Sequence, residues 1–458
     1  MRYTFTFPES CYDAVCAHLI GFDDSERAGY VFAGMSRCED ETRLIAREFW
    51  PVRDEHIISR SRVHLSIRPE SYIRALQHAD ETGQSFWFIH SHPEGFEEFS
   101  RQDDAEEPGL FRTAYIRVGG ERVHGSIVFP CGGEPFGRAW LDAKTTVPLA
   151  RIRSVGERFR FADPRGEEAP IAEFFDRQVR AFGEDIQRLL ARLHIAVVGA
   201  GGTGSAVCEQ LIRLGVGRLS IYDPDTLDGS NVNRVYGSGV SAAGVLKVRL
   251  IEELAARIGL GTVVRAFPRS IYDKETARTL READLIFGCT DEDFGRSILN
   301  EIALRYAIPV IDMGIRIDSE AGRIRSICGR VTVLQPGAAC LWCRGRISAE
   351  RVAEDSRRHF TPDEAETRRR EGYAPELVEN NPAVIPFTTA VAAGAVAELL
   401  HRLTGFMGGS RATSETLFRF DQNEVGKNAE APRADCRCAQ PAILASGDTR
   451  DFLGMLWA

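Results

Sequence analysis

The chain has 458 residues, and the usual size of about 100–200 residues per domain predicts two or three domains. Apolar residues make up 43% of the sequence and charged residues 27%, which excludes a largely disordered and a collagenous protein. With 57 basic and 66 acidic side chains the net charge is −9, and because this charge repels phosphate backbones we expect no nucleic-acid partner.

The apolar stretches are too short for membrane insertion. AVAAGAVAELL at 390–400 falls well below the roughly 20 residues that cross a bilayer, so neither a membrane span nor a membrane partner is predicted. The first residues, MRYTFTFPES, lack the basic, apolar and small-residue segments of a secretory signal, which predicts a cytoplasmic protein. Its 11 cysteines are then expected to be reduced and to serve as metal ligands or buried thiols.

The first 160 residues have a mixed α+β pattern. Strands are predicted at 29–33, 45–52, 85–92 and 122–129, and helices at 9–20 and 69–82. A polar segment with Pro and Gly, FADPRGEEAP at 161–170, has the composition of a linker. We place the domain boundary there.

A candidate metal site lies at the end of the strand predicted at 85–92. His90 and His92 are two residues apart, so in a strand both imidazoles point to the same side. Asp103 follows eleven residues after His92 and can return as a third ligand, with Ser100 shortly before it. Two histidines and one carboxylate leave the fourth position of tetrahedral zinc open, which is typical of a catalytic site.

Hydrolysis at such a zinc also needs a base, for which Glu26 is our candidate. The spacing His-x-His-Pro, six residues, Ser, two residues, Asp resembles the signature of JAMM (MPN+) metalloproteases, which cleave bonds after the C-terminus of ubiquitin-like proteins. That family also carries a glutamate before a Gly-containing strand, as in ERAGYVFAG at 26–34. The resemblance implies that Ser100 orients the scissile carbonyl or stabilises its oxyanion. Glu48 and Glu55 are fallback bases, and a solvated loop with a chance histidine pair is the alternative.

A second constellation opens the region 171–458, which begins with an amphipathic stretch from Ala172 to Leu193. HIAVVGAGGTGSAVCEQLIRLGVG then predicts a buried strand, a glycine turn and a helix within a βαβ unit at 195–223. Glycines let the backbone approach a phosphate, which the N–H groups at the helix start bind. The turn contains Gly199, Gly201, Gly202 and Gly204. Alone, this motif fits NAD, FAD or ATP. Asp223, at the end of the next strand, is placed for a ribose hydroxyl and does not distinguish among these three ligands.

Polar residues downstream favour adenylation. Asn231, Arg234, Lys247 and Asp291 supply an amide, two cations and a carboxylate. Attack at an α-phosphate needs charge neutralisation and Mg²⁺, whereas a nicotinamide site has little use for such a set. These motifs resemble the family of ThiF, MoeB and ubiquitin-activating enzymes over most of 172–440.

That resemblance implies a role for each residue. Asp223 would bind the ribose, Asp291 would bind Mg²⁺, and the triphosphate of ATP would be held by Asn231, Arg234 and Lys247. Arg177, in the segment DRQVRAFGEDIQRLL at 176–190, matches an arginine that reaches the γ-phosphate of a facing subunit. The resemblance therefore also implies a homodimer with two composite sites.

Four cysteines suggest a structural zinc site. CLWC at 340–343 has the spacing of a zinc knuckle, and its partner pair is Cys436 and Cys438, one residue closer together than is usual in the family. We predict Zn²⁺ at Cys340, Cys343, Cys436 and Cys438, with four unrelated thiols as the alternative. Loss of this zinc should loosen the domain rather than abolish its chemistry.

The usual thioester cysteine of ubiquitin-activating enzymes is missing here. Their nucleophile follows the first zinc pair, but residues 344–435 contain no cysteine. The segment 348–376 is instead highly charged, which is typical of a solvated helix or a mobile crossover loop. We therefore predict adenylation without a thioester at the usual place, with Cys328 and the knuckle cysteines as alternative nucleophiles that no motif supports.

Together these features predict an α/β protein, with an α+β MPN/JAB domain at 1–160 and a Rossmann-like doubly wound adenylation domain at 171–458. We expect a zinc (iso)peptidase that processes or deconjugates a ubiquitin-like protein, joined to an adenylyltransferase that activates its C-terminal glycine. Expected partners are a ubiquitin-like or sulfur-carrier β-grasp protein, a second copy of the chain, and a conjugating enzyme or acceptor thiol. The alternatives are sulfur-carrier activation and processing in cofactor or cysteine biosynthesis without lysine conjugation, a scaffold role for one domain, and an NAD-linked oxidoreductase.

Overall fold

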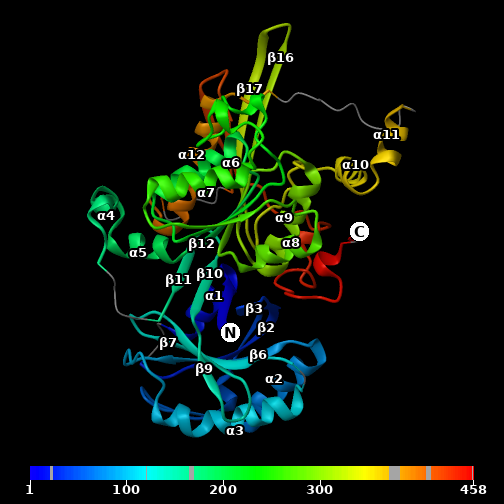
Figure 1. Ribbon diagram of the computed structural model, residues 1–458. Coiled ribbons are helices and arrows are strands. Elements are labelled where there is room, and N and C mark those ends of the chain that lie inside the picture. Colours follow the sequence, from blue (N-terminus) through cyan, green and yellow to red (C-terminus); the bar gives the residue numbers. More distant parts are fainter. Residues whose placement is uncertain are drawn as a thin grey trace. The chain divides into compact units, whose positions relative to one another are not determined.

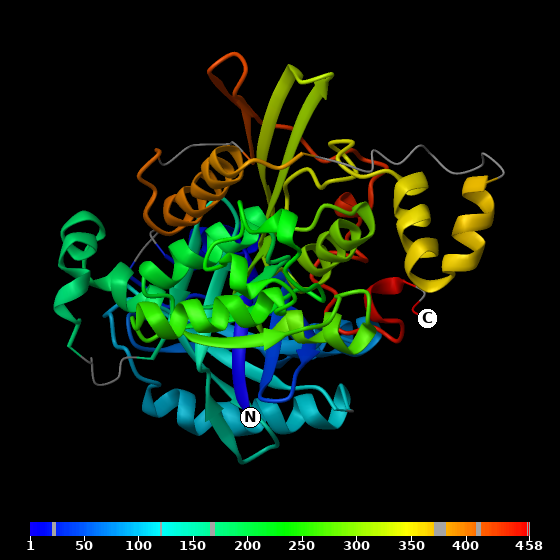
Figure 2. The same cartoon turned by 45° about the horizontal axis from the view of Figure 1, so that its top comes forward.

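A computed structural model describes residues 1–20, 24–119, 121–164, 170–370, 382–408, 414–455 and 457 (Figures 1 and 2). The chain forms two compact units, the first comprising Met1–Glu168, Arg305–Ala307 and Pro441–Arg450, and the second comprising the rest. The predicted linker at 161–170 begins inside the last strand of the first unit, and residues 165–169 lie outside the described part of the chain. Residues 441–450 belong to the first unit, which no feature of the sequence indicates.

Within the described residues, the first unit contains a nine-stranded sheet in the order β11-β10-β1-β3-β2-β6-β7-β8-β9. Its strands are β1 (Arg2–Pro8), β2 (Ala28–Arg37), β3 (Glu41–Pro51), β6 (Ser85–His92), β7 (His124–Pro130), β8 (Phe136–Trp140), β9 (Thr146–Pro148), β10 (Arg151–Val155) and β11 (Phe159–Ala162). A separate hairpin joins β4 (Ile57–Arg60) to β5 (Leu65–Ile67), and the helices are α1 (Glu9–Leu19), α2 (Pro69–Thr82) and α3 (Arg101–Arg117). The strands and helices predicted for this half are confirmed, with ends that differ by a few residues.

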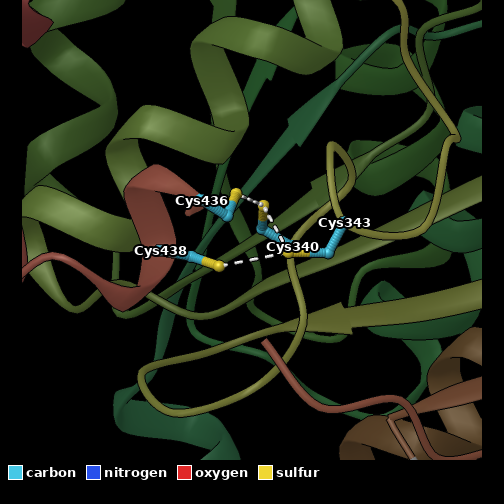
Figure 3. A group of neighbouring side chains, drawn as sticks. All are labelled: Cys340, Cys343, Cys436 and Cys438. Carbon is cyan, nitrogen blue, oxygen red and sulfur yellow. Dashed lines mark hydrogen bonds between the residues drawn. The ribbon is translucent and has the colours of Figure 1, made fainter. Parts of the chain in front are cut away.

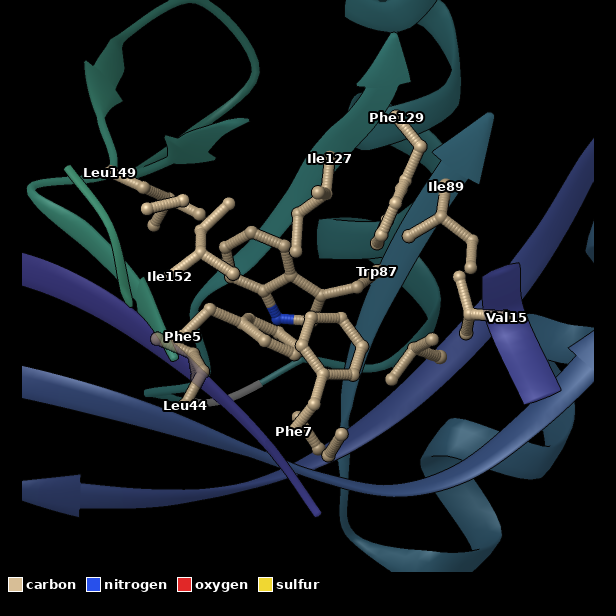
Figure 4. Close-up of a cluster of buried hydrophobic side chains, with 14 of the residues drawn as sticks. Phe5, Phe7, Val15, Leu44, Trp87, Ile89, Ile127, Phe129, Leu149 and Ile152 are labelled. Atoms are coloured by element: carbon tan, nitrogen blue, oxygen red, sulfur yellow. The ribbon is translucent and has the colours of Figure 1, made fainter. Parts of the chain in front are cut away.

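Strand β6 is buried on both faces, and this decides where its histidines lie. Trp87 and Ile89 point into a core that includes Phe5 of β1 and Val15 of α1 (Figure 4). The alternate residue Phe86 packs instead into a second core with side chains of α2 and α3. Because side chains alternate along a strand, His90 and His92 share the face that α3 covers.

The second unit contains an eight-stranded sheet in the order β14-β13-β12-β15-β16-β17-β18-β19 within the part of the chain that is described. Its strands are β12 (His194–Val198), β13 (Arg218–Tyr222), β14 (Val263–Phe267), β15 (Leu285–Gly288), β16 (Val310–Glu320), β17 (Arg323–Leu334), β18 (Glu415–Arg419) and β19 (Glu424–Asn428). Its helices are α4 (Asp176–Phe182), α5 (Glu184–Arg192), α6 (Gly202–Arg213), α7 (Lys247–Ile258), α8 (Lys274–Thr279), α9 (Asp293–Tyr306), α10 (Ala349–Phe360), α11 (Pro362–Arg370) and α12 (Ile385–Thr404).

The strand order of this sheet creates a binding crevice. The first five strands in this order, β14, β13, β12, β15 and β16, run parallel, and β12 lies between β13 and β15. The strand order reverses at β12, because β13 and β14 follow on one side of it and β15 and β16 on the other. In such sheets the binding crevice lies beyond the carboxyl ends of the strands at which the order reverses. The βαβ unit predicted at 195–223 is confirmed as β12, α6 and β13.

Two expectations about helices need correction. The amphipathic stretch from Ala172 to Leu193 is not one continuous helix: it is interrupted at Gly183, whose φ of +87° favours glycine, so α4 and α5 are separate helices. The charged segment 348–376 is not simply solvated: α10 buries Glu354 and Asp355, while residues 371–376 lie outside the described residues. No described helix has both the length and the apolar composition needed to span a membrane.

Candidate functional site

A cavity of about 1010 Å³ opens at the carboxyl ends of β12, β13 and β15. The predicted residues that line it are Gly199, Gly201, Gly202, Asp223, Asn231, Arg234, Lys247 and Asp291. Among the described residues, Gly204 is buried behind the turn, and Arg177 is exposed on α4 outside the cavity lining. The fold thus brings one polar set, scattered along the sequence, into a single cavity.

The glycine turn is shaped by close backbone approach. Gly199 has a φ of +95°, which side chains rarely adopt. A Cβ atom at Gly204 would lie 1.8 Å from the carbonyl oxygen of Gly199, so only glycine lets α6 start this close to β12. Gly201, by contrast, has no atom within 4 Å of its ideal Cβ position. The first N–H groups of α6 therefore line the cavity where an anion can be bound.

Asp223 ties this turn to the end of β13. Its Oδ2 accepts the N–H of Ala200 at 2.6 Å, and its Oδ1 accepts the N–H of Asp225 at 2.9 Å. Burial raises the pKa of Asp223, an effect that the nearby charge of Lys247 opposes. The carboxylate therefore has a structural task in addition to the ribose contact that the sequence suggests.

The two predicted cations are oriented by neighbouring polar groups. Arg234 donates through Nη2 to Oδ1 of Asn231 at 2.7 Å and through Nη1 to the carbonyl of Ser230 at 2.8 Å. Lys247, the first residue of α7, has its Nζ 2.7 Å from Oδ2 of Asp225. Both side chains line the cavity, so two oriented positive charges are placed where they can neutralise an anionic ligand.

A buried ion cluster lies behind the cavity, and no motif in the sequence indicates it. Asp312 of β16 is fully buried, its Oδ2 lies 2.5 Å from Nη1 of Arg330, and its Oδ1 lies 3.5 Å from Nε of Arg296. Both arginines line the cavity and add positive charge to it. They come from β17 and α9, so no local motif in the sequence connects them.

In the first unit the predicted zinc ligands converge. Oδ1 of Asp103 lies 3.1 Å from Nε2 of His90, and its Oδ2 lies 3.5 Å from Nε2 of His92. The ligand atoms all lie within 4.8 Å of one another. The Nδ1 atom of His92 lies 3.0 Å from the carbonyl oxygen of Phe96, and a donated Nδ1–H there leaves Nε2 free as a ligand. The donor set of two imidazoles and one carboxylate therefore fits a zinc ion with an open position.

Glu26 lies buried close to this cluster. Ala28 of β2 pairs with His90 of β6, which brings Glu26, two residues before Ala28, to the end of β6 that carries the histidines. Burial raises the pKa of Glu26, and the charges of His90 and His92 oppose that rise. The fallback bases are engaged elsewhere: Glu48 accepts from Nε1 of Trp50 at 2.6 Å, and Glu55 is exposed beside Arg53.

Ser100 belongs to a helix cap. Its Oγ accepts the N–H of Asp103 at 3.1 Å, while its own N–H donates to Oδ2 of Asp103 at 2.7 Å. This capping box starts α3 and fixes the orientation of the Asp103 carboxylate.

The four predicted cysteines of the second unit lie together and are buried (Figure 3). The sulfur of Cys340 lies 3.9 Å from that of Cys343 and 3.5 Å from that of Cys436, and Cys343 and Cys438 are 3.4 Å apart. Zinc–sulfur bonds of about 2.3 Å in a tetrahedron place the sulfurs about 3.8 Å apart. Burial raises the pKa of Cys436 to about 11, a penalty on the thiolate that a bound cation reverses. The cluster fits a structural zinc site.

Replacing Cys436 by serine should lower zinc content by one equivalent per chain and destabilise the second unit by roughly 2–3 kcal/mol, a fall of about 5–10 °C in Tm. The physical reason is that one ligand is lost while three buried thiolates remain close together. Metal analysis and thermal denaturation measure both effects. Cys131→Ser, which alters an exposed thiol, is the matched control. Unchanged zinc content in Cys436→Ser would rule out the Cys₄ site.

Comparisons with known proteins match the second part of the chain. The ThiF family matches residues 175–440. Molybdopterin-synthase adenylyltransferase of Escherichia coli is 30% identical over 180 residues, which cover 38% of this chain and 69% of that protein. Adenylyltransferase and sulfurtransferase UBA4 of Meyerozyma guilliermondii is 28% identical over 144 residues, and ubiquitin-like modifier-activating enzyme 5 of Arabidopsis thaliana is 27% identical over 166 residues. The matches span 34% and 37% of the length of these last two relatives.

A solved structure of E. coli MccB with ATP covers 59% of this chain and 75% of its own, with 15% identity and a TM-score of 0.46. The family match extends over more than half of the sequence, and together with the glycine turn and its cavity it defines the class of protein. The chain belongs to the ThiF family.

Proposed function

We propose that the second unit adenylates the C-terminal carboxylate of a small β-grasp protein of the sulfur-carrier kind. The observation that carries this proposal is the single cavity that joins the glycine turn to Arg234, Lys247 and Asp291. The names of the relatives support it, because molybdopterin-synthase adenylyltransferase and UBA4 are adenylyltransferases.

The cavity suits in-line attack at an α-phosphate. The N–H groups at the start of α6 would bind the phosphates, and Arg234 and Lys247 would neutralise the triphosphate. Asp291 would hold Mg²⁺, which supplies further charge neutralisation when bound. The carboxylate oxygen of the partner forms a bond to the α-phosphorus, the bond to the pyrophosphate oxygen breaks, and pyrophosphate leaves with the electron pair. The products are an acyl-adenylate and pyrophosphate.

Sulfur transfer accounts better than lysine conjugation for the missing thioester cysteine. Residues 344–435 contain no cysteine, so the acyl group has no thiol at the place that ubiquitin-activating enzymes use. A hydrosulfide-level external donor would then attack the acyl carbon of the acyl-adenylate. The bond from that carbon to the phosphate oxygen would break, AMP would leave with the electron pair, and the partner protein would carry a thiocarboxylate. Mass spectrometry of the partner distinguishes a thiocarboxylate from a lysine-linked conjugate, and the conjugate would contradict this proposal.

The central test is ATP–pyrophosphate exchange with a cognate β-grasp protein that ends in Gly-Gly. We expect exchange with the free C-terminus and none when the same protein carries a C-terminal amide, because only a carboxylate can attack the α-phosphate. The amidated protein is therefore the matched control. Exchange that proceeds equally without any protein substrate would refute the proposed function.

A homodimer belongs to this proposal. Arg177 is exposed on α4 and lies outside the cavity lining of its own chain, as expected for a side chain that completes the site of a second copy. Mixing the Arg177→Ala chain with an Asp291→Ala chain should restore one working site per mixed dimer. Failure of this complementation, with both chains folded and dimeric, would remove the role of Arg177.

A second function is proposed for the first unit: hydrolysis of a peptide or isopeptide bond after the terminal glycine of the same kind of protein. The convergent atoms of His90, His92 and Asp103 beside buried Glu26 favour it. Bound zinc supplies Lewis acidity at the scissile carbonyl. Glu26 would take a proton from the attacking water and return it to the leaving amine, and the Ser100 hydroxyl would donate to the carbonyl oxygen.

A further inference from the structure

The turn that carries Asp291 is capped by a residue far away in the sequence. Helix α9 starts at Asp293, and the first N–H groups of a helix have no partner within it. Here the N–H groups of Asp293 and Phe294 both donate to Oδ2 of Asp355, at 2.8 and 3.2 Å. Asp355 lies on α10 and is buried. A segment that directly follows the cysteine knuckle thus supplies the N-terminal cap of α9.

The two helices cap each other. Oδ2 of Asp293 accepts the N–H of Ser348 at 3.1 Å, and Ser348 is itself the N-cap of α10, where its Oγ accepts the N–H of Arg351 at 3.3 Å. Asp355, in the middle of α10, therefore accepts N–H groups at the start of α9, and Asp293, at the start of α9, accepts the N–H of the residue that caps α10. If α10 moves away, both groups of N–H donors lose their partners.

Further contacts hold the residue next to Asp291. Arg358 of α10 donates through Nη2 to Oδ1 of Asp355 at 2.5 Å, and its Nη1 lies 3.8 Å from Oε1 of Glu292. The Tyr272 hydroxyl also donates to Glu292. Asp291 itself is exposed and lines the cavity. The residues immediately after it are thus fixed by α10, while its own carboxylate stays open to a ligand.

We propose that Asp355 is a positioning residue that sets the Asp291 carboxylate for magnesium, so that the docked state of α10 controls adenylation. This inference rests on the proposed function. Mg²⁺ requires near-ideal octahedral geometry at about 2.0–2.1 Å, so a small displacement of one ligand weakens binding. Without the Asp355 cap the first turn of α9 frays, and Asp291, two residues before that helix, loses its fixed position.

The test measures Mg²⁺-dependent ATP binding by calorimetry, beside pyrophosphate exchange against Mg²⁺ concentration, in the full-length protein. Asp355→Ala should raise the Mg²⁺ concentration at half-saturation about tenfold, the factor expected from the loss of one helix cap. Asp355→Asn keeps an oxygen acceptor at the same place and should stay within about threefold of the wild type. The KM for the β-grasp protein should stay unchanged, because Asp355 does not line the cavity. Glu350→Gln, an exposed change on the same helix, is the matched control.

Arg358→Ala gives an independent test on a partly exposed side chain if Asp355→Ala does not fold. Because Arg358 orients Asp355, we expect a rise of about threefold in the same Mg²⁺ half-saturation. Wild-type Mg²⁺ dependence in Asp355→Ala, or in Arg358→Ala when the first variant is unfolded, overturns the inference. If the wild type shows no protein-dependent exchange at all, the proposed function itself has failed.

Discussion

Asp291→Ala should lower ATP–pyrophosphate exchange by about 10²–10³-fold while the protein stays folded. Asp291 is exposed at the carboxyl end of β15 and lines the cavity beside the glycine turn. If Asp291 holds Mg²⁺, its loss removes neutralisation of the negative charge that builds up on pyrophosphate as it departs. The substitution therefore lowers mainly the rate of the chemical step.

The measurement is exchange at saturating ATP and partner protein, with ATP binding followed separately by calorimetry. Asp185→Asn, an exposed carboxylate on α5 away from the cavity, is the control and should behave as the wild type. Exchange within a few-fold of the wild type in Asp291→Ala would show that another group holds the metal.

Glu26→Gln should reduce cleavage of a β-grasp protein that is extended beyond Gly-Gly by about 10²–10⁴-fold, the range for loss of a general base. Glutamine has nearly the same shape as glutamate but cannot accept the proton from water. Zinc content should stay unchanged, because the ligands are His90, His92 and Asp103.

Cleavage is followed by mass spectrometry of the released extension. Glu48→Gln, which alters a carboxylate bonded to Trp50, is the matched control and should cleave normally. His92→Ala should lose both zinc and cleavage. Pyrophosphate exchange should persist in Glu26→Gln, and cleavage should persist in Asp291→Ala. Normal cleavage in Glu26→Gln would exclude this glutamate as the base.

The local features of both sites were predictable from short stretches of sequence. His90 and His92 share a face because strand side chains alternate, and the strand predicted at 85–92 has the same bounds as β6. The glycine turn is predictable because strand, turn and helix follow one another directly in the chain. The role of the segment after the knuckle was not predictable, since its charge pattern indicates a solvated helix and does not reveal that Asp355 caps α9.

The amino-acid sequence by itself determined the strands and helices of the first unit, the βαβ unit with its glycine turn, and the residue types of three candidate sites, because each depends on neighbours along the chain. Only the tertiary structure decided that Asp312 pairs with Arg330 and that Asp355 reaches α9. Such contacts join residues from separate elements, and they depend on how those elements pack, which no local period or motif encodes.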